Sequence, residues 1–328
     1  MATPAVFVIH ENPEWLPPLA AAFTAEGVPL TEWLLTGGSI DLAAAPPEGV
    51  FWSRLSASAH TRDHADTKDF TRAVLTWLEG HGRRVVNGRH VVELEVSKVA
   101  QYTALANAGF DVPRTIAVFG RQDLSRRARE FELPFIAKHN EGGKGLGVRR
   151  FDSYEDFDAY ATSAAFEAPS DGITLLQEYL RAAEPFVTRV EFVGGRYVYA
   201  VRVDISAGSF ELCPADACEV PQVIAGAICD ADGNPAPDAP PPFSRRLDFD
   251  DHPIVERYRA FLEAARIDVA GIECIETVDG RLVTYDVNTN TNYNPAVEAE
   301  APRSGPGEIA RYLGRLLQEQ YGAALPTA

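Results

Sequence analysis

Cysteine, lysine and long apolar runs are scarce in this chain of 328 residues, and each scarcity excludes a class of protein. Four cysteines are too few for a disulfide framework. No run of 18 apolar residues occurs, so we expect no membrane-spanning helix. The first residues, MATPAVFVIHENPEWLPPLA, lack the positive start and long apolar core of a signal peptide. The sequence therefore predicts a cytoplasmic protein.

Positive charge is also scarce. The formal net charge is −17, which argues against a nucleic-acid partner or an anionic membrane surface, because either would favour a basic face. A small anionic ligand in a local basic pocket stays compatible with this balance. Apolar residues make up 46% of the chain, as in a globular protein with a substantial core. The length favours two or three compact units.

The few lysines stand in informative places. Only four of the 30 basic residues are lysine, namely Lys68, Lys98, Lys138 and Lys144. Two of them flank the glycines of IAKHNEGGKGLGV, residues 136–148. Glycines allow a backbone to approach phosphate oxygens, and an ammonium group neutralises their charge. The stretch matches neither the GxxxxGK[ST] loop nor the GxGxxG fingerprint. A phosphate-binding loop and a merely flexible hairpin loop both remain open on this stretch alone.

Three of the cysteines, Cys213, Cys218 and Cys229, lie close together in the chain, upstream of His252. They allow a zinc site in principle, but their spacing matches no common zinc pattern. Ordinary reduced thiols are the favoured interpretation.

The first third of the chain alternates predicted strands and a helix. AVFVIH, LTEWLL and GVFWSRLS indicate strands, and an amphipathic stretch lies between the first two, over residues 15–26. This order predicts an α/β unit with a parallel sheet, which gathers ligands beyond the carboxyl ends of its strands. Arg54, Ser56 and His60 lie there, either as ligand contacts or as an ordinary polar loop.

The rest of the chain predicts helices and antiparallel hairpins, with one irregular segment. Hairpins are predicted for FVTRVEFVGGRYVYAVRVDIS and VAGIECIETVDGRLVTYDVN, and residues 206–250, rich in proline, alanine and aspartate, predict an insertion or mobile loop. Helices are predicted for EVSKVAQYTALANAGF, DLSRRAREF, YEDFDAYATSAAF, HPIVERYRAFLEAARI and GEIARYLGRLLQEQYG. Further strands are predicted for VPRTIAVF, for both sides of the glycine loop and for ITLLQEYL.

The second hairpin carries a candidate metal site. Alternate residues of a strand share one face, so Asp286 and Asn288 project together, and Glu273 on the paired strand can face them. Two carboxylates and an amide oxygen suit Mg²⁺, whose shell substrate phosphates can complete. A solvated sheet face is the alternative. Together with the lysine loop, the cluster describes a nucleoside triphosphate site.

In this order the motifs resemble the ATP-grasp superfamily, and within it the glutamate ligases of the ribosomal-S6-modification (RimK-like) type. The likeness runs from about Gly49 to the end of the chain, and it rests on SKVAQYTALANAGFDVPRT, IAKHNEGGKGLGV, LLQEYL, GIECI and YDVN. It implies an α/β protein with the ATP-grasp fold, in which a small parallel α/β domain precedes two α+β subdomains that clamp the nucleotide. The implied division is an N-terminal domain over 1–92, a central subdomain over 93–180 and a C-terminal subdomain over 181–328.

The resemblance also implies residue roles. Lys98, Lys138 and Lys144 would contact phosphates with the loop glycines Gly143 and Gly145, and Glu273, Asp286 and Asn288 would bind one or two Mg²⁺ ions, with Mn²⁺ as an alternative. The adenine hinge would comprise Gln177, Glu178, Tyr179 and Leu180. Arg202 would steady the phosphoryl group, with Arg189 as the competing candidate. Arg54 would hold a substrate carboxylate, near the further substrate candidates His60 and Asn290.

The implied activity is ATP-dependent joining of a carboxylate to an amine through an acyl phosphate, on an amino acid or peptide. A small-molecule kinase and a nucleotide-binding module without turnover are the alternatives. The fold often forms pairs, so a homo-oligomer stays open.

Several positions depart from the family pattern. Asp286 replaces a more usual glutamate, and Val187 replaces an acidic residue that contacts ribose, leaving Glu184 as a substitute. The segment NTNTNYN follows the metal strand as either an acceptor-binding loop or a turn. These differences affect the acceptor most, so the resemblance does not imply addition of glutamate to a ribosomal protein.

Overall fold

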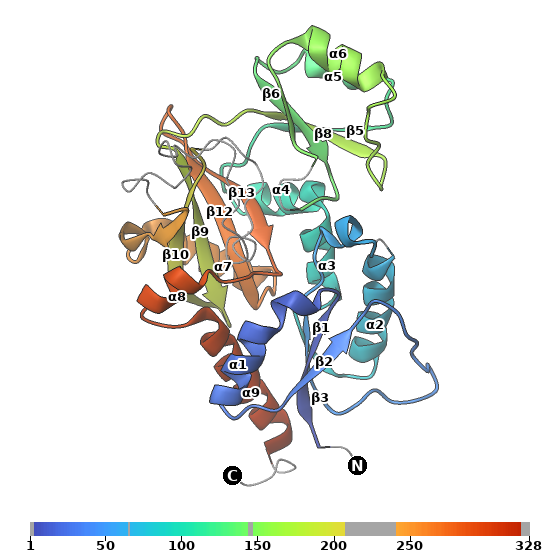
Figure 1. Ribbon diagram of the computed structural model, residues 1–328, viewed down its shortest axis with the longest axis vertical. Coiled ribbons are helices and arrows are strands. Elements are labelled where there is room, and N and C mark those ends of the chain that lie inside the picture. The colour runs from blue at the N-terminus through green and yellow to red at the C-terminus, as the bar shows by residue number, and fades with distance from the viewer. Residues whose placement is uncertain (1–2, 65, 144–146, 207–240, 323–328) are drawn as a thin grey trace, which may run out of the picture.

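In the part of the chain that the structure describes there are three β-sheets, and each lies within one of the three segments expected from the sequence (Figure 1). The computed structural model describes residues 3–64, 66–143, 147–206 and 241–322. Lys144, Gly145 and the three clustered cysteines fall outside these residues, so the predictions made for them are not addressed by the structure. No helix in the described part of the chain has the length and apolarity that crossing a membrane needs.

The N-terminal sheet is wholly parallel and has the order β2-β1-β3-β4. Its strands are β1 (Ala5–His10), β2 (Leu30–Leu34), β3 (Gly49–Ser53) and β4 (Arg84–Val86). Helices α1 (Pro17–Ala25) and α2 (Thr67–Gly80) accompany it, with short 3-10 turns at Pro13–Trp15 and Ala59–Arg62. The apolar run AVFVIH suits a strand of a parallel sheet, which is covered on both faces, and nearly all of its residues are buried. The parallel α/β prediction is confirmed.

The central sheet is antiparallel, with the order β5-β8-β6-β7. Helices α3 (Arg89–Val96) and α4 (Lys98–Asn107) lead into it, and Figure 1 places both between the sheets. Its strands are β5 (Thr115–Phe119), β6 (Phe135–His139), β7 (Arg149–Phe151) and β8 (Ile173–Glu178), and its covering helices are α5 (Leu124–Ala128) and α6 (Tyr154–Thr162). Stacked and edge-on rings of Phe135, Phe151 and Phe157 fill the core under the helices.

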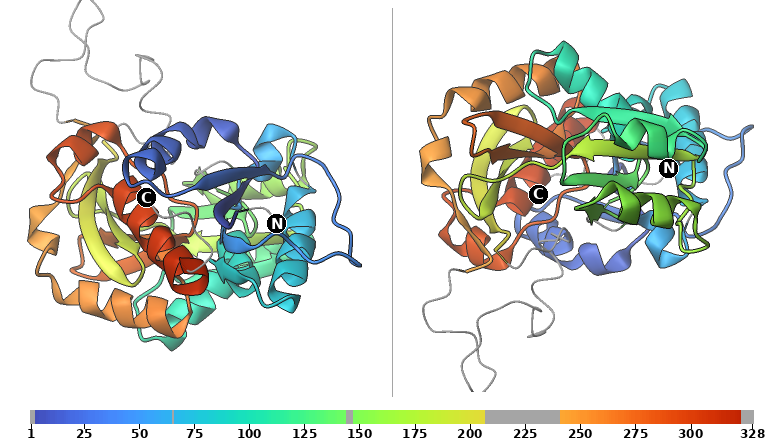
Figure 2. Two further views of the ribbon diagram at one scale, coloured as in Figure 1. Left: turned by 90° about the horizontal axis from the view of Figure 1, so that it is seen from below. Right: turned by 90° about the horizontal axis from the view of Figure 1, so that it is seen from above.

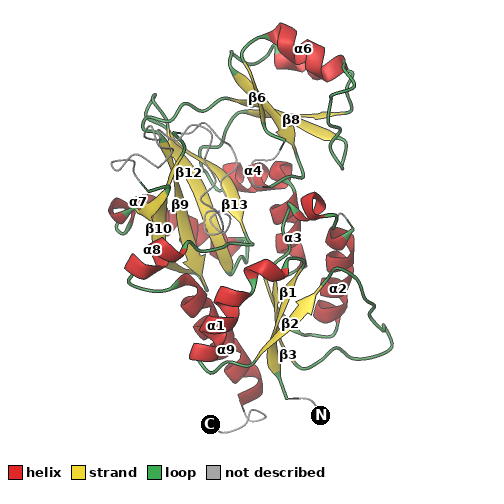
Figure 3. Cartoon of the chain, viewed as in Figure 1, coloured by secondary structure: helices red, strands yellow, loops and turns green. Residues whose placement is uncertain are grey.

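The C-terminal sheet is also antiparallel and has the order β11-β10-β9-β12-β13 (Figure 3). Its strands are β9 (Phe186–Val193), β10 (Arg196–Asp204), β11 (Phe243–Arg245), β12 (Val269–Glu276) and β13 (Leu282–Asn288). Its helices are α7 (Pro253–Ala264), α8 (Pro295–Glu300) and α9 (Gly305–Tyr321), with a 3-10 turn at Leu247–Phe249. The irregular segment predicted over residues 206–250 is therefore too long, because Phe243–Arg245 within it form β11, which pairs with Val201–Val203.

The two faces of this sheet pack against different parts of the molecule. Val190 and Phe192 face a core that contains Tyr258 of α7. Val187 and Val201 alternate with them and face a second core, which continues through α9 into the N-terminal sheet. The view from below shows α9 running beside the N-terminal strands (Figure 2). The closing helix thus joins the first and last thirds of the chain in one core.

Candidate functional site

A lysine at the start of α4 and an aspartate of β13 meet in an ion pair. Helix α4 begins at Lys98, because the Ser97 side chain caps it by accepting a hydrogen bond from the Ala100 N–H. The Lys98 ammonium forms an ion pair with the Asp286 carboxylate, and their side chains are only 13% and 21% exposed. The pair couples the start of α4 to the end of the C-terminal sheet.

Glu273 and Asn288 complete a cluster of oxygen-bearing side chains around Asp286. Glu273 lies opposite Asp286 in the β12–β13 register, and Asn288 Nδ2 donates to Glu273 Oε1 at 3.1 Å. Burial raises the pKa of Glu273, opposed by Arg189 and assisted by Asp286. The Asn288 bond orients the amide so that its oxygen faces away from Glu273.

This donor set fits Mg²⁺ in chemistry, because its oxygens are hard and include two carboxylates. Across the described residues, no group of three or more histidine, cysteine, aspartate or glutamate side chains is arranged to hold a metal ion. A cation here would therefore depend on the amide of Asn288 and on ligands from a substrate.

Arg189 binds the carboxylates on the same face of the sheet. Its Nε donates to Glu191 at 2.6 Å, Nη1 to Glu273 at 3.1 Å and Nη2 to the Thr291 hydroxyl at 2.6 Å. Burial alone would lower the pKa of Arg189, but Glu191 and Glu273 outweigh it and raise the pKa. Arg189 is therefore a permanent, fixed cation.

A glycine makes room for this arginine. A Cβ on Gly271 of β12 would lie 2.7 Å from Arg189 Nε and 2.8 Å from Nη2. Because three hydrogen bonds hold the guanidinium in place, it cannot move aside without losing them.

The strand register separates Arg202 from this cluster. Arg202 pairs with Thr188, whereas Arg189 pairs with Val201, so the two arginines point to opposite faces of the sheet. The Arg202 guanidinium lies 4.0 Å from the centre of the Phe186 ring. The order of the two arginine candidates therefore has to be reversed: the geometry favours Arg189.

Lys138 approaches the site from the central sheet. Its ammonium donates to the Tyr102 hydroxyl at 2.7 Å, and that hydroxyl donates to Gln177 Oε1 at 3.1 Å. Burial, assisted by the positive charge of Lys98, lowers the pKa of Lys138 to about 7. Unlike Arg189, this cation has no carboxylate in direct contact among the residues that the structure describes.

The expected adenine hinge is only partly free to bind a base. Gln177 is buried against Tyr102, and Glu178 receives two bonds from Arg281 at 3.3 and 3.0 Å and one from the Arg114 N–H at 2.8 Å. The Glu178 carboxylate is therefore already bound within the protein, and adenine binding by the backbone after β8 stays a prediction. Two further hinge candidates lie after β8: half-buried Tyr179, which stacks under Arg150, and half-buried Leu180. Glu184, the candidate for contact with ribose, is exposed.

The glycine loop lies against the N-terminal domain. Glu141 at the start of the loop accepts a bond of 2.5 Å from Lys68 on α2. A Cβ on Gly143 would lie 3.2 Å from the backbone nitrogen and Cβ of Ser58. Lys68, which had no role in the sequence interpretation, thus attaches the loop to α2.

Arg54 sits beyond β3 and reaches across to the segment after β13. Only 1% exposed, it donates through Nη2 to the Thr291 carbonyl and the Asn292 side chain, both at 2.9 Å. Its Nε and Nη1 are buried without a hydrogen-bond partner, as is Asn290 Oδ1. His60, by contrast, is exposed on its turn.

Sequence reasoning missed Glu191 and Tyr102. Glu191 accepts bonds from both Arg189 and Thr291, at 2.6 and 2.9 Å. The R-x-E spacing on β9 contained this signal, because alternate residues share a face. Tyr102 gave no such signal, since its partner Lys138 is 36 residues away.

Neither a protein-family model nor a curated protein matches this sequence. Solved structures do match over nearly the whole chain, at 15% or 16% sequence identity. The D-cycloserine synthetase DcsG has a TM-score of 0.66, with 95% of this chain and 100% of that chain covered. A RimK-domain ATP-grasp protein from Sphaerobacter thermophilus has 0.63, with 94% and 99% covered. The ATP-grasp ligase PsnB, solved with a minimal precursor, has 0.62, with 95% and 99% covered.

These likenesses confirm the ATP-grasp fold expected from the sequence. Sequence identity at this level supports a conclusion about the fold alone, so the chemistry must be argued from the residues of this chain.

Proposed function

We propose that this protein is an ATP-dependent carboxylate–amine ligase that forms an amide or peptide bond on an amino acid or peptide and releases ADP and phosphate. The observation that carries the proposal is the placement of Arg189, Glu273, Asp286 and Asn288 on one sheet face, with Lys98 and Lys138 reaching the same place from other elements. Fixed cations beside hard oxygens are what phosphoryl transfer requires. Structural neighbours that are ligases support this class, and one PsnB structure contains Mg and ADP.

The proposed role of each residue follows from its charge. Lys98 and Lys138 contact the phosphates, and Arg189 faces the transferring phosphoryl group with a guanidinium that the protein holds in place. Glu273, Asp286 and Asn288 would hold Mg²⁺, which neutralises charge on the phosphate oxygens when bound. The backbone after β8 holds adenine. Lys144 and Gly145 belong to the same proposal as residues of the loop over the phosphates.

The reaction balances without a protein nucleophile. A carboxylate oxygen attacks the γ-phosphorus, the bond to the β-phosphate oxygen breaks, and ADP leaves. The amine then attacks the acyl carbon; the C–N bond forms as the C–O bond to phosphate breaks, and the amine loses a proton to solvent. Arg54 offers its unpartnered Nε and Nη1 to a substrate carboxylate, and Asn290 is a further candidate for substrate contact.

Incubation with ATP and Mg²⁺ against a panel of carboxylic acids, amino acids and amines tests the proposal. ADP, AMP and phosphate are quantified, and products are weighed by mass spectrometry. We expect ADP and phosphate only with a particular pair of substrates, and a product lighter than their sum by one water. AMP would overturn the mechanism, a phosphorylated product would indicate a kinase, and ATP binding without turnover across the panel would indicate a binding module.

A further inference from the structure

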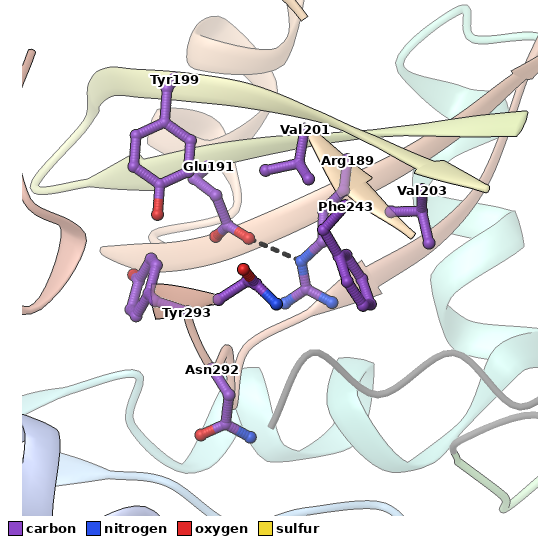
Figure 4. A pocket seen from close by; sticks show the side chains of 9 residues that line it. Arg189, Glu191, Tyr199, Val201, Val203, Phe243, Asn292 and Tyr293 are labelled. Carbon is purple, nitrogen blue, oxygen red and sulfur yellow. Dashed lines mark hydrogen bonds and ion pairs between the residues drawn. The ribbon is translucent and has the colours of Figure 1, made fainter. Parts of the chain in front are cut away.

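The segment that follows β13, residues 289–294, passes beside Arg189 and carries a buried threonine. Thr291 is 1% exposed, and its hydroxyl accepts a hydrogen bond from Arg189 Nη2 at 2.6 Å. The same hydroxyl donates to Glu191 at 2.9 Å, while Arg189 Nε donates to the other oxygen of Glu191 at 2.6 Å. These three side chains therefore close a ring of hydrogen bonds. Figure 4 shows the bond between Arg189 and Glu191, with Asn292 and Tyr293 of the segment beside it.

The ring adds a third point of attachment to the Arg189 guanidinium. Glu191 lies two residues away on β9, and Glu273 lies opposite Arg189 in the β9–β12 register, so the sheet itself holds Nε and Nη1. Thr291 holds Nη2 from outside the sheet. Because a guanidinium is planar and rigid, bonds at all three nitrogens fix both its place and its tilt.

The segment that carries Thr291 is itself anchored by other parts of the molecule. Glu95 of α3, which is buried, accepts hydrogen bonds from the Thr289 N–H at 2.7 Å and the Thr289 hydroxyl at 2.8 Å. Arg54, which follows β3, donates through Nη2 to the Thr291 carbonyl at 2.9 Å. The backbone of Thr291 is thus held by the N-terminal domain, while its hydroxyl bonds to a residue of the C-terminal sheet.

The proposed reaction requires that the substrate carboxylate and the transferring phosphoryl group meet in line. Arg54 is the residue proposed for the carboxylate and Arg189 the residue proposed for the phosphoryl group, and Thr291 bonds to both arginines. The Thr291 hydroxyl is committed to Arg189 and Glu191, so it acts through Arg189 and not on a substrate. Precise placement matters, because a displacement of about 1 Å can lower a rate by about 100-fold.

We infer that Thr291 is a positioning residue for phosphoryl transfer, whose hydroxyl fixes the Arg189 guanidinium and whose carbonyl ties it to Arg54. The inference rests on the proposed ligase function. It adds a residue to which neither the motifs nor the family resemblance gave a role, and it assigns part of the segment NTNTNYN to the alignment of the reacting groups.

The test uses two substitutions of Thr291 and one matched control. Thr291→Val removes the hydroxyl and nearly keeps the size of the side chain, whereas Thr291→Ser keeps the hydroxyl. Thr284→Val is the control, because Thr284 on β13 is also 1% exposed and its hydroxyl lies 2.7 Å from the Tyr258 hydroxyl, away from Arg189. ADP release is measured with the carboxylate and amine that give turnover in the panel, ATP affinity is measured by calorimetry with Mg²⁺, and melting temperatures are recorded.

Thr291→Val should lower kcat by about tenfold and leave the Kd of ATP within about twofold, since Arg189 acts on the group in transfer. Thr291→Ser should restore kcat to within about threefold of wild type, because the hydroxyl is present. Thr284→Val should lower the melting temperature as Thr291→Val does, without changing kcat. Unchanged kcat in Thr291→Val, or a loss that Thr291→Ser does not restore, would overturn the inference.

A measurement on the protein without ligand separates this inference from the ligase proposal. The nitrogen-15 signal of the Arg189 Nε–H is assigned by its loss in Arg189→Met, and its hydrogen exchange is followed. Exchange should quicken by about tenfold in Thr291→Val and stay near the wild-type rate in Thr291→Ser and Thr284→Val.

The combination of the two measurements decides between the proposals. Turnover by wild type with equal exchange in all variants would leave the ligase standing and refute the role of Thr291. If wild type turns over no substrate of the panel, the ligase proposal fails and exchange alone decides whether Thr291 fixes Arg189. A selective increase in Thr291→Val then supports that role, and equal exchange in all variants refutes it.

Discussion

The two cations that flank the candidate nucleotide site, buried Arg189 and half-buried Lys138, are held in opposite ways. Arg189, on the C-terminal sheet, contacts two carboxylates that raise its pKa, so its charge is fixed whether or not a ligand is bound. Lys138, on the central sheet, donates to the neutral Tyr102 hydroxyl and pairs with no carboxylate among the described residues, and burial lowers its pKa to about 7. Protein carboxylates therefore balance the charge of Arg189, whereas a bound anion would balance the charge of Lys138. We expect substitutions at and around Arg189 to affect the chemical step and substitutions of Lys138 to affect ATP binding.

The largest expected effect follows removal of the fixed cation. Arg189→Met should lower kcat by about 100-fold or more, the cost typical of losing one group that stabilises transition-state charge. Arg202→Met is the matched control, because that arginine lies on the other sheet face; its kcat should stay within about threefold of wild type. Melting temperatures are measured alongside, since Arg189→Met leaves Glu191 and Glu273 buried without their partner. Equal losses in both variants would contradict the assignment of faces.

The next effect concerns the oxygens beside Arg189. Asp286→Asn removes one of two carboxylates, so the Mg²⁺ concentration for half-maximal activity should rise by about tenfold or more. It also removes the partner of Lys98. Titration of ATP turnover with Mg²⁺ checks this, with Asp279→Asn, an aspartate of the β12–β13 turn, as the control. Unchanged Mg²⁺ dependence in Asp286→Asn would show that the metal assignment is wrong.

A subtler change displaces Arg189 without altering any charge. The new methyl group of Gly271→Ala would occupy the space of the guanidinium, so kcat should fall by about tenfold while the fold is kept. Gly280→Ala tests glycine replacement elsewhere, at a left-handed turn with nothing within 4 Å of the new Cβ. Its effect should appear in stability and not in kcat. Full activity of Gly271→Ala would mean that the position of Arg189 does not matter.

The smallest expected effect concerns the charge of Lys138. Lys138 is increasingly neutral above pH 7, and the ATP phosphates favour its charged form, so ATP affinity should fall several-fold as pH rises from 7 to 9. Below about pH 6 this lysine is almost fully charged and contributes little further change. Lys138→Arg keeps the charge throughout and should flatten the decline. Calorimetry in buffers of different ionisation enthalpy should show proton uptake on ATP binding at pH 8 in wild type only.

The sequence predicted the parallel N-terminal sheet, both C-terminal hairpins and the meeting of Glu273 with Asp286, because strand periodicity determines which side chains share a face. Periodicity alone does not decide whether Arg202 and Arg189 share a face, because they lie thirteen positions apart on the two sides of a hairpin turn. The strand register shows that they face opposite ways. Local pattern could not show that Glu178 is bound by Arg281 or that Arg54 reaches Asn292, because these partners are 103 and 238 residues away. Contacts of that kind are decided by tertiary packing.

The most direct test of the account is the transfer of labelled oxygen. Wild type is given ATP, Mg²⁺, an amine and a carboxylate substrate labelled with oxygen-18, and the released phosphate is analysed by mass spectrometry. Activation at the face that carries Arg189 predicts one labelled oxygen in each phosphate, at a rate that Arg189→Met reduces and Arg202→Met does not. Phosphate without label, or label in AMP, would contradict the acyl-phosphate mechanism.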